Sequence, residues 1–262
     1  MLSACLIVKN EEATLPRCLD ALRGLADQVV VVDTGSTDNT RAIAAASGAD
    51  VFDYAWQESF ADARNVALSH AREPWTLVID ADETVEDTDC ADTRARLEAD
   101  GLPDVLLVRL RLEYPGSRET TMLAPRILRT AAGIRYVHAI HEQLEVEDQQ
   151  ALLSNVVLRH SGYALPEDIE RKERRNLRIA EQMPPSPHAL HSVARAALSL
   201  KEWPKASDAA QALLARTDVS PVLRREGAVL GALAAIQGRD TAGLGRFIEQ
   251  VVAVDSNHPD AS

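Results

Sequence analysis

The chain has 262 residues, of which 46% are hydrophobic and 26% charged, and its formal net charge at pH 7 is -12. This composition is that of an ordinary globular protein, so we expect most of the chain to fold around a sizeable core. The negative charge argues against nucleic acid and anionic membrane surfaces as partners, because both repel an acidic protein. The one basic run, residues 171–175, is interrupted by Glu173.

The first apolar run is too short to be a signal peptide or a membrane span, because Lys9 interrupts it. The three cysteines, Cys5, Cys18 and Cys90, form no closely spaced pair. Their odd number argues against a disulfide framework, and their spacing argues against structural zinc. We therefore expect a cytoplasmic protein without a membrane span.

Short apolar runs alternate with helical patterns in the first half of the chain. Strands are predicted at residues 4–8, 28–32, 50–54 and 75–79. Helices are predicted between them, beginning at Leu15 with Pro16 in the first turn, at residues 37–47 before Gly48, and at residues 60–71. This alternation is typical of a parallel sheet with crossover helices.

The pattern changes from Asp104 onward. Four apolar residues alternate with less apolar ones, as in a half-exposed strand: Leu106, Val108, Leu110 and Leu112. Two further short strands are predicted at residues 126–129 and 156–159. The sheet is therefore expected to end in mixed or antiparallel strands.

No strand pattern follows Tyr163. A charged helix is predicted at residues 166–182, and the prolines at 184, 185 and 187 are typical of a hinge. The Ala- and Leu-rich helices beyond them form two helix–turn–helix copies near the 34-residue period of tetratricopeptide repeats. Gly243 stands where such repeats usually have alanine, and an ordinary helical cap is the alternative. We predict domains at 1–165 and 188–262, joined by a helix and hinge at 166–187.

Polar residues follow three of the predicted strands. They occupy residues 9–12, 33–38 and 80–83. Ligands bind outside the carboxyl ends of strands in open α/β sheets, so these three segments should form one site. The carboxylates of Asp80, Asp82 and Glu83 repel one another unless a cation or hydrogen-bond donors compensate. Either this loop is solvated or it holds a metal ion.

These segments together carry a resemblance to a known family. The sequences CLIVKNEEATLPRCLDAL, VVVVDTGSTDNT, ADARN and LVIDADE resemble the nucleotide-sugar domain of family 2 glycosyltransferases, over residues 2–163. PRILR, HEQL and RHSGY resemble the subgroup with a C-terminal tetratricopeptide region, which is similar to bacteriocin peptide S- and O-glycosyltransferases and to some cell-surface glucosyltransferases. The resemblance implies an α/β fold, a Rossmann-like GT-A domain with a mixed sheet, followed by a small all-α helical-repeat domain.

The resemblance also implies roles for single residues. Asp33 would bind the nucleotide base, and Arg64 would line the same pocket or meet the diphosphate. The implied nucleotide-sugar residues are Val8, Asn10, Asp33, Gly35, Arg64, Asp80 and Ala81. Asp33 could instead cap the next helix, although Ser36 or Thr37 is better placed to do so. Arg64 could instead be an exposed helix residue, and Gly35 a turn residue.

The pattern Asp80-Ala81-Asp82 resembles the DxD motif of this family. Asp82 would bind Mn²⁺ or Mg²⁺, and Asp80 would contact the ribose or a metal-bound water. His160 would be a third ligand or touch the diphosphate, although it could merely bond a backbone carbonyl. Hard cations prefer oxygen ligands and bridge phosphates through one or two protein carboxylates.

An inverting transfer also needs a base beside the acceptor. Glu142 is the first candidate and His141 the second, since either could be tuned towards a neutral pKa. His141 could instead orient Glu142, and both could lie in a surface turn. A cysteine acceptor would need less help, because thiols ionise near neutrality.

We therefore predict an inverting, metal-dependent hexosyltransferase that uses UDP-glucose or UDP-GlcNAc and modifies a peptide Cys, Ser or Thr. A lipopolysaccharide or other glycan acceptor is one alternative. A nucleotidyltransferase would need a basic, glycine-rich loop after the first strand, which KNEEAT is not. A non-catalytic peptide-binding adaptor is disfavoured by the intact acidic residues of the site. Two repeat units are few, so dimerisation or packing on the first domain should stabilise them.

Overall fold

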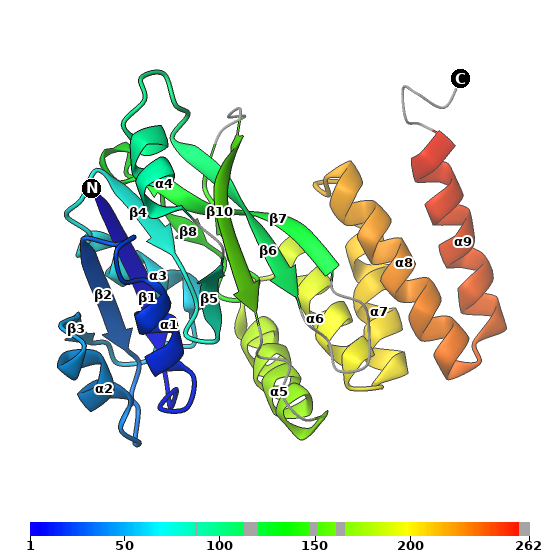
Figure 1. Ribbon diagram of the computed structural model, residues 1–262. Coiled ribbons are helices and arrows are strands. Elements are labelled where there is room, and N and C mark those ends of the chain that lie inside the picture. Colours follow the sequence, from blue (N-terminus) through cyan, green and yellow to red (C-terminus); the bar gives the residue numbers. More distant parts are fainter. Residues whose placement is uncertain (87–88, 113–119, 147–150, 161–165, 257–262) are drawn as a thin grey trace. The chain divides into compact units, whose positions relative to one another are not determined.

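The structure is a computed structural model, and it describes residues 1–86, 89–112, 120–146, 151–160 and 166–256 (Figure 1). The chain divides into two compact units. The first contains Met1–His138 and Glu142–Tyr163, and the second contains Ala139–His141 and Ala164–Ser262. The short segment 139–141 therefore belongs to the second unit, although the first unit surrounds it in the sequence.

The first unit is built on one mixed sheet, whose strand order within the described residues is β3-β2-β1-β4-β7-β6-β10-β5. Four neighbouring strands are parallel: β1 (Leu2–Val8), β2 (Gln28–Asp33), β3 (Asp50–Asp53) and β4 (Trp75–Val78). They are the four strands predicted from the first half of the sequence. Because β2, β1 and β4 are adjacent and parallel, the loops that follow them leave the sheet at one edge.

The rest of the sheet is partly antiparallel. It consists of β5 (Glu83–Glu86), β6 (Val105–Leu112), β7 (Thr120–Arg129) and β10 (Leu152–His160). Strand β7 is antiparallel to β4 and β6, β5 is antiparallel to β10, and β10 is parallel to β6. The predicted mixed sheet is confirmed, although β7 and β10 are longer than predicted.

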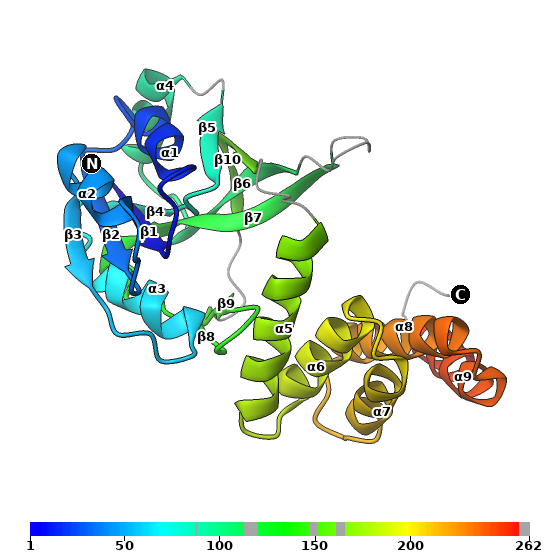
Figure 2. The ribbon, with the colours of Figure 1, turned by 90° about the horizontal axis from the view of Figure 1, so that it is seen from below.

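Helices cover both faces of the parallel strands. On one face, α1 (Leu15–Ala21), α2 (Thr40–Ala46) and α4 (Cys90–Leu97) share a core with Leu6 and Leu77. On the other face, α3 (Phe60–Ser69) packs Ala67 against Cys5 and Val30. Figure 2 shows α1 and α3 on opposite sides of β1.

A small hairpin lies on the same face of the sheet as α3. Its strands are β8 (Tyr136–Val137) and β9 (Gln143–Leu144), and a 3₁₀ turn at Thr130–Ala132 precedes it. Tyr136 packs with Ala61 of α3 and with Leu128 of β7. The side chain of Asn65 donates to the carbonyl of Tyr136 at 2.9 Å and accepts from its N–H at 2.8 Å. Helix α3 and the hairpin are therefore joined by packing and by two hydrogen bonds.

Helix α2 begins later than predicted, at Thr40 instead of residue 37. Its N-cap residue is Asn39, whose side chain makes no capping bond, so the expected cap at Ser36 or Thr37 is wrong. Ser36 instead donates to Asp33, and the carboxylate of Asp38 accepts from the N–H of Thr40. These local bonds hold residues 33–38 as a loop.

The second unit consists of helices and their connections in its described residues from Pro166 onward. Its helices are α5 (Pro166–Gln182), α6 (Pro187–Ser199), α7 (Trp203–Leu214), α8 (Pro221–Gly238) and α9 (Thr241–Ser256). Their core consists largely of alanines together with Phe247, and the predicted helical region is confirmed. The N–H of Gly243 donates to Asp240 Oδ1 at 2.9 Å, and a Cβ atom on Gly243 would require that carboxylate to shift. No helix in the described ranges is long and apolar enough to cross a membrane.

Candidate functional site

The loops after β1 and β2 are tied together at the carboxyl edge of the sheet. The N–H of Asn10 donates to Ser36 Oγ at 2.9 Å, and the N–H of Thr37 donates to Asn10 Oδ1 at 2.7 Å. Asn10 has a φ of +57° and Gly35 a φ of +102°, both in the left-handed region. Gly35 adopts this conformation without steric cost because it lacks a Cβ atom.

Asp33 is the last residue of β2, and its side chain is buried. Its carboxylate accepts hydrogen bonds from the N–H and the hydroxyl of Ser36. The carbonyl of Val8 accepts from both the N–H and the hydroxyl of Thr34. The side chains of Val8 and Ala81 lie in the main core, so these side chains are not available to a ligand.

Arg64 of α3 connects two of the predicted site carboxylates. Its Nη2 donates to Asp80 Oδ1 at 2.8 Å, and its Nε donates to Glu142 Oε1 at 2.6 Å. The Arg64 side chain is 9% exposed, and its remaining nitrogen, Nη1, is buried without a hydrogen-bond partner among the residues that the structure describes. A buried donor of this kind is costly unless a ligand accepts from it.

A cavity of about 440 Å³ opens beside this ion pair. Arg64, Arg126, Tyr136 and Glu142 contribute to its wall, together with the start of β9. The guanidinium of Arg64 lies 5.6 Å from the centre of the Tyr136 ring, within the range of a cation–π interaction. The cavity thus combines a cationic side, a carboxylate and apolar surface.

Arg126 is a site residue to which sequence analysis assigned no role. Its Nη2 lies 3.0 Å from Glu83 Oε1 and 3.4 Å from Asp80 Oδ2. The pairing of β7 with β6 shifts register once, between Ile127 and Pro125, so Arg126 is the extra residue of a β-bulge. The sequence signal that could have indicated a role for Arg126 was its charge between the apolar residues Pro125 and Ile127.

The loop from Asp80 to Glu83 is held from inside the protein. Glu83 is 1% exposed, and its Oε2 accepts from the N–H of Asp80 at 2.9 Å. Burial raises the pKa of Glu83, and the charge of Arg126 opposes this shift. Burial alone would raise the pKa of Asp80 too, but Arg64 and Arg126 hold it well below the usual range of an aspartate.

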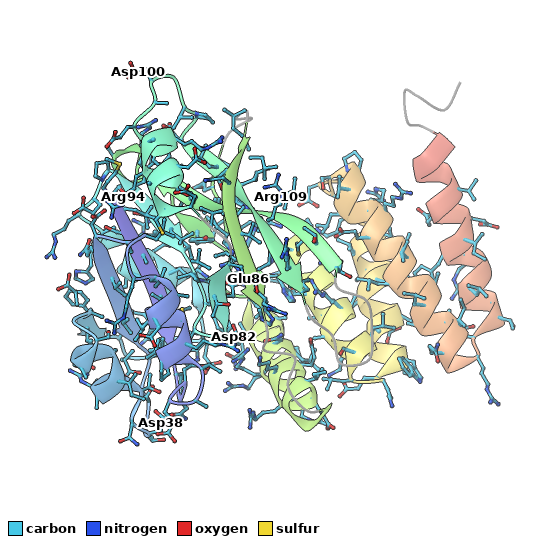
Figure 3. The ribbon with its side chains drawn as sticks, viewed as in Figure 1. Asp38, Asp82, Glu86, Arg94, Asp100 and Arg109 are labelled. Carbon is cyan, nitrogen blue, oxygen red and sulfur yellow. The ribbon has the colours of Figure 1, made fainter. Side chains whose placement is uncertain are left out.

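Asp82 lies in the loop before β5 and approaches the end of β10 (Figure 3). Its Oδ2 is 3.3 Å from Nε2 of His160. Burial alone would lower the pKa of His160, but the hydrogen bond to Asp82 and the nearby carboxylates raise it above the usual value. Register places His160 opposite Glu83 of β5, which fixes its position at the strand end.

The side chains of Asp82 and His160 could hold a divalent cation that takes most of its ligands from groups outside the protein. In the part of the chain that the structure describes, no three acidic, histidine or cysteine side chains form a metal-binding group. Both oxygens of Asp80 already face arginines, so Asp82 and His160 are the better pair of protein ligands. Mg²⁺ and similar ions are commonly bound through one or two protein groups plus substrate phosphates.

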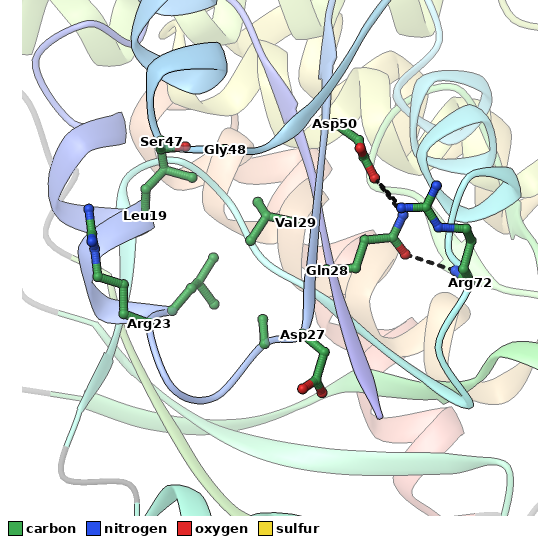
Figure 4. A pocket seen from close by; sticks show the side chains of 11 residues that line it. Leu19, Arg23, Asp27, Gln28, Val29, Ser47, Gly48, Asp50 and Arg72 are labelled. Carbon is green, nitrogen blue, oxygen red and sulfur yellow. Dashed lines mark hydrogen bonds and ion pairs between the residues drawn. The ribbon is translucent and has the colours of Figure 1, made fainter.

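A second cavity, of about 300 Å³, lies at the opposite edge of the sheet (Figure 4). Gln28 and Asp50, the first residues of β2 and β3, line it with Arg72. The Gln28 amide donates to Asp50 and to the carbonyl of His70, and accepts from Ser3 and from the N–H of Arg72. Since these polar groups satisfy one another, the cavity offers little for a ligand.

Comparison with known proteins gives a consistent result. The sequence model described as "Glycosyl transferase family 2" matches residues 3–152. A TPR repeat-containing protein of Synechococcus elongatus is 33% identical over 172 residues, which cover 62% of this chain and 42% of that protein. The SPbeta prophage-derived glycosyltransferase SunS of Bacillus subtilis is 27% identical over 187 residues, which cover 68% of this chain and 44% of SunS. The chain thus matches less than half the length of these relatives.

The crystal structure of S. aureus TarS residues 1–349 in complex with UDP-GlcNAc has a similar fold. The two structures align with a TM-score of 0.53 and 18% sequence identity, over 97% of this chain and 90% of that chain. Similarity at this identity shows the fold. The predicted GT-A-like mixed sheet followed by a helical region is confirmed.

Proposed function

We propose that this chain, which belongs to glycosyl transferase family 2, transfers a hexose from a UDP-sugar to an acceptor with inversion at the anomeric carbon. The observation that carries the proposal is the position of Arg64. It joins Asp80, which follows β4, to Glu142, which precedes β9. It also lines a cavity, and no other described residue bonds its buried Nη1. Such a donor suits the oxygens of a diphosphate or a sugar.

The proposed donor site lies at the carboxyl ends of β1, β2 and β4. Asp33, buried and fixed by Ser36, would accept hydrogen bonds from the uracil base or the ribose. Arg64 would face the diphosphate. We choose a UDP-sugar because the fold matches a TarS fragment that was crystallised with UDP-GlcNAc; UDP-glucose is the second donor to test.

Asp82 and His160 would hold Mn²⁺ or Mg²⁺, for which their position and chemistry fit. When bound, such a cation stabilises the charge on the departing diphosphate. Asp80 would contact the ribose while its charge is balanced by Arg64 and Arg126. The protein groups themselves keep the loop rigid, since Glu83 binds both the N–H of Asp80 and Arg126.

Glu142 is the proposed base. In a single displacement, the acceptor oxygen or sulfur forms a bond to the anomeric carbon while the bond from that carbon to the diphosphate breaks. The acceptor proton passes to the Glu142 carboxylate, whose Oε1 is fixed by Arg64 at 2.6 Å. His141, the second candidate, precedes it directly in the chain.

A peptide is the proposed acceptor, modified at a Cys, Ser or Thr side chain. Two antiparallel helix pairs follow the first unit, and helix-repeat arrays form surfaces that bind peptides. The similarity to a TPR repeat-containing protein supports the same proposal.

The test is mass spectrometry of acceptors incubated with the protein, Mn²⁺ and either UDP-GlcNAc or UDP-glucose. Otherwise identical peptides would carry one Cys, one Ser or only Ala at the test position, and a lipopolysaccharide core oligosaccharide would be included. We expect one added sugar on the Cys or Ser peptide, none on the Ala peptide, and none with Glu142→Gln. Transfer to the oligosaccharide alone would overturn the peptide acceptor. Absence of any transfer would overturn the proposed activity.

A further inference from the structure

The segment that leads to Glu142 has an unusual backbone. His138 has a φ of +70° and His141 a φ of +51°, and both values lie in the left-handed region. Residues other than glycine rarely adopt this conformation, although histidine does so more often than most. Such residues persist only where the surrounding structure holds them in place, and they concentrate at functional sites.

A histidine from the helical unit holds this segment. The Nε2 of His188 lies 2.8 Å from the carbonyl oxygen of Ile140. A carbonyl oxygen only accepts hydrogen bonds, so Nε2 carries the proton that is shared. His188 is 7% exposed and Ile140 is 4% exposed, which removes water as a competitor for this bond. His188 is itself fixed in the first turn of α6, which Ser186 caps.

The chain passes from one unit to the other at this point. It leaves the first unit after His138, contributes Ala139 to His141 to the helical unit, and returns at Glu142. One residue separates the held carbonyl of Ile140 from Glu142, and that residue, His141, has the strained φ. The bond to His188 therefore holds the carbonyl that stands two residues before Glu142 in the chain.

The other side of Glu142 is also fixed. Its Oε1 accepts from Arg64 at 2.6 Å, and β9 begins at the next residue. Loss of the bond to Ile140 would allow His141 to relax from its left-handed conformation. Since β9 is only two residues long, it offers little resistance to a rotation of the preceding residue.

We propose that His188 is a positioning residue for Glu142 and that it acts through the carbonyl of Ile140. The helical unit thus takes part in the transfer step, in addition to any role in binding an acceptor. This inference rests on the proposed function, in which Glu142 is the base. A purely structural role for His188 would affect the stability of the helical unit, which includes Ala139–His141, and leave kcat unchanged.

Substitutions at two histidines of helix α6 distinguish these two roles. His188→Ala removes the bond, and His188→Gln keeps a donor at nearly the same distance from the backbone. His191 lies about one turn further along α6, and its Nε2 is 3.1 Å from Glu226 of α8. His191→Ala therefore deletes a second, similarly enclosed histidine, whose charged partner lies on α8 and outside the segment.

Hydrogen exchange of the full-length protein gives a test that does not require activity. We expect amides of residues 139–144 to exchange about tenfold faster in His188→Ala, as expected for the loss of one hydrogen bond to buried backbone. His188→Gln and His191→Ala should exchange there as the wild type does. Unchanged exchange in His188→Ala, or equally fast exchange in His191→Ala, would overturn the inference.

Steady-state kinetics tests the catalytic consequence. We expect kcat of His188→Ala to fall about tenfold or more, because a small displacement of a reacting group is costly. The KM for the UDP-sugar should change less than about twofold, and His188→Gln should recover most of kcat. Wild-type kcat in His188→Ala would overturn the inference. Failure of the wild type to transfer any sugar would overturn the proposed function instead, and the exchange result would still decide whether His188 holds the segment.

Discussion

Arg64 and Arg126 explain how several carboxylates can lie together at one edge of the sheet. Each arginine contacts one oxygen of Asp80, and each also contacts a second carboxylate, Glu142 or Glu83. The repulsion expected from the sequence is thus balanced by the guanidinium groups of buried Arg64 and partly buried Arg126. The acidic loop keeps its shape from protein contacts, and Asp82 lies outside this network beside His160.

Arg64→Gln should destabilise the protein and abolish UDP binding. The substitution leaves Asp80 and Glu142 without their shared partner, and removal of one member of a buried ion pair costs about 3 kcal/mol. Urea unfolding would measure the free energy of unfolding. Arg72→Gln is the control, since Arg72 is 71% exposed and its pair with Asp50 should contribute less than about 1 kcal/mol. Equal effects of the two substitutions would contradict the role given to Arg64.

His160 should make the binding of Mn²⁺ depend on pH. The raised pKa means that the protonated imidazole stabilises the folded protein below its ordinary pKa, and that this stabilisation is lost as pH rises through the raised value. A metal ligand must be deprotonated, so affinity for Mn²⁺ with UDP present should rise with pH by up to about tenfold per unit below that pKa. Calorimetry at several pH values would measure the slope. The same slope in His160→Gln would rule out His160 as its source.

Sequence motifs named the residues of the site but not their contacts. Arg64 and Glu142 are 78 residues apart, and their hydrogen bond depends on the hairpin that packs on α3. Arg126 received no role because a β-bulge sets its direction, and no sequence period indicates a bulge there. The pairing of Asp82 with His160 likewise depends on β10 ending beside β5.

At the scale of elements, helix α3 contributes two adjacent residues that organise the candidate site. Arg64 reaches the carboxylates, and Asn65 binds both backbone groups of Tyr136. The helix therefore places the cationic wall of the cavity and also holds β8, whose Tyr136 lines the same cavity. Ser59 caps the helix by accepting from the N–H of Asp62.

Asn65→Ala should weaken both stability and UDP binding. Two hydrogen bonds to buried backbone groups are lost, which should lower the free energy of unfolding by about 2 kcal/mol. The hairpin would then shift, and UDP affinity should fall. The control is Ser59→Ala, which should cost about 1 kcal/mol through the lost cap and leave UDP affinity unchanged. Unaltered UDP binding in Asn65→Ala would show that the hairpin does not shape the donor site.

Helices and strands were predicted correctly where the hydrophobic periodicity of the sequence is strong. They were missed where pairing with a distant strand determines the structure. The strands β1 to β4 and helix α5 were predicted to within two residues of their observed limits. Strand β5 was missed because Glu-Thr-Val-Glu shows no apolar face; it forms by pairing with β10. Helix α4 was missed too, since it buries only Thr93 and Leu97.

At the scale of the whole molecule, the proposed donor site belongs entirely to the first unit. Asp33, Arg64, Asp80, Asp82 and His160 all lie within its segments. The helical unit would affect transfer through the segment that precedes Glu142 and through the acceptor. Damage confined to the helical core should therefore lower stability without changing UDP affinity.

Gly231→Ala tests this separation. A Cβ atom there would lie 2.3 Å from a ring carbon of buried Phe247, so the substitution should destabilise the helical unit by about 2 kcal/mol. Gly245→Ala is the matched control. Beyond its own helix backbone and chain neighbours, its added Cβ would meet no described atom within 4 Å, and alanine favours a helix by about 1 kcal/mol. Thermal unfolding and UDP calorimetry would be measured on both. Loss of UDP binding in Gly231→Ala would place part of the donor site in the second unit.

The most direct test of a metal-dependent UDP-sugar site is calorimetric titration of UDP into the wild type and Asp82→Ala, each with and without Mn²⁺. We predict that UDP binds the wild type tightly only with Mn²⁺, and that Asp82→Ala loses this metal-dependent part of the affinity. Absence of UDP binding under all conditions, or equal binding by Asp82→Ala with Mn²⁺, would contradict the account.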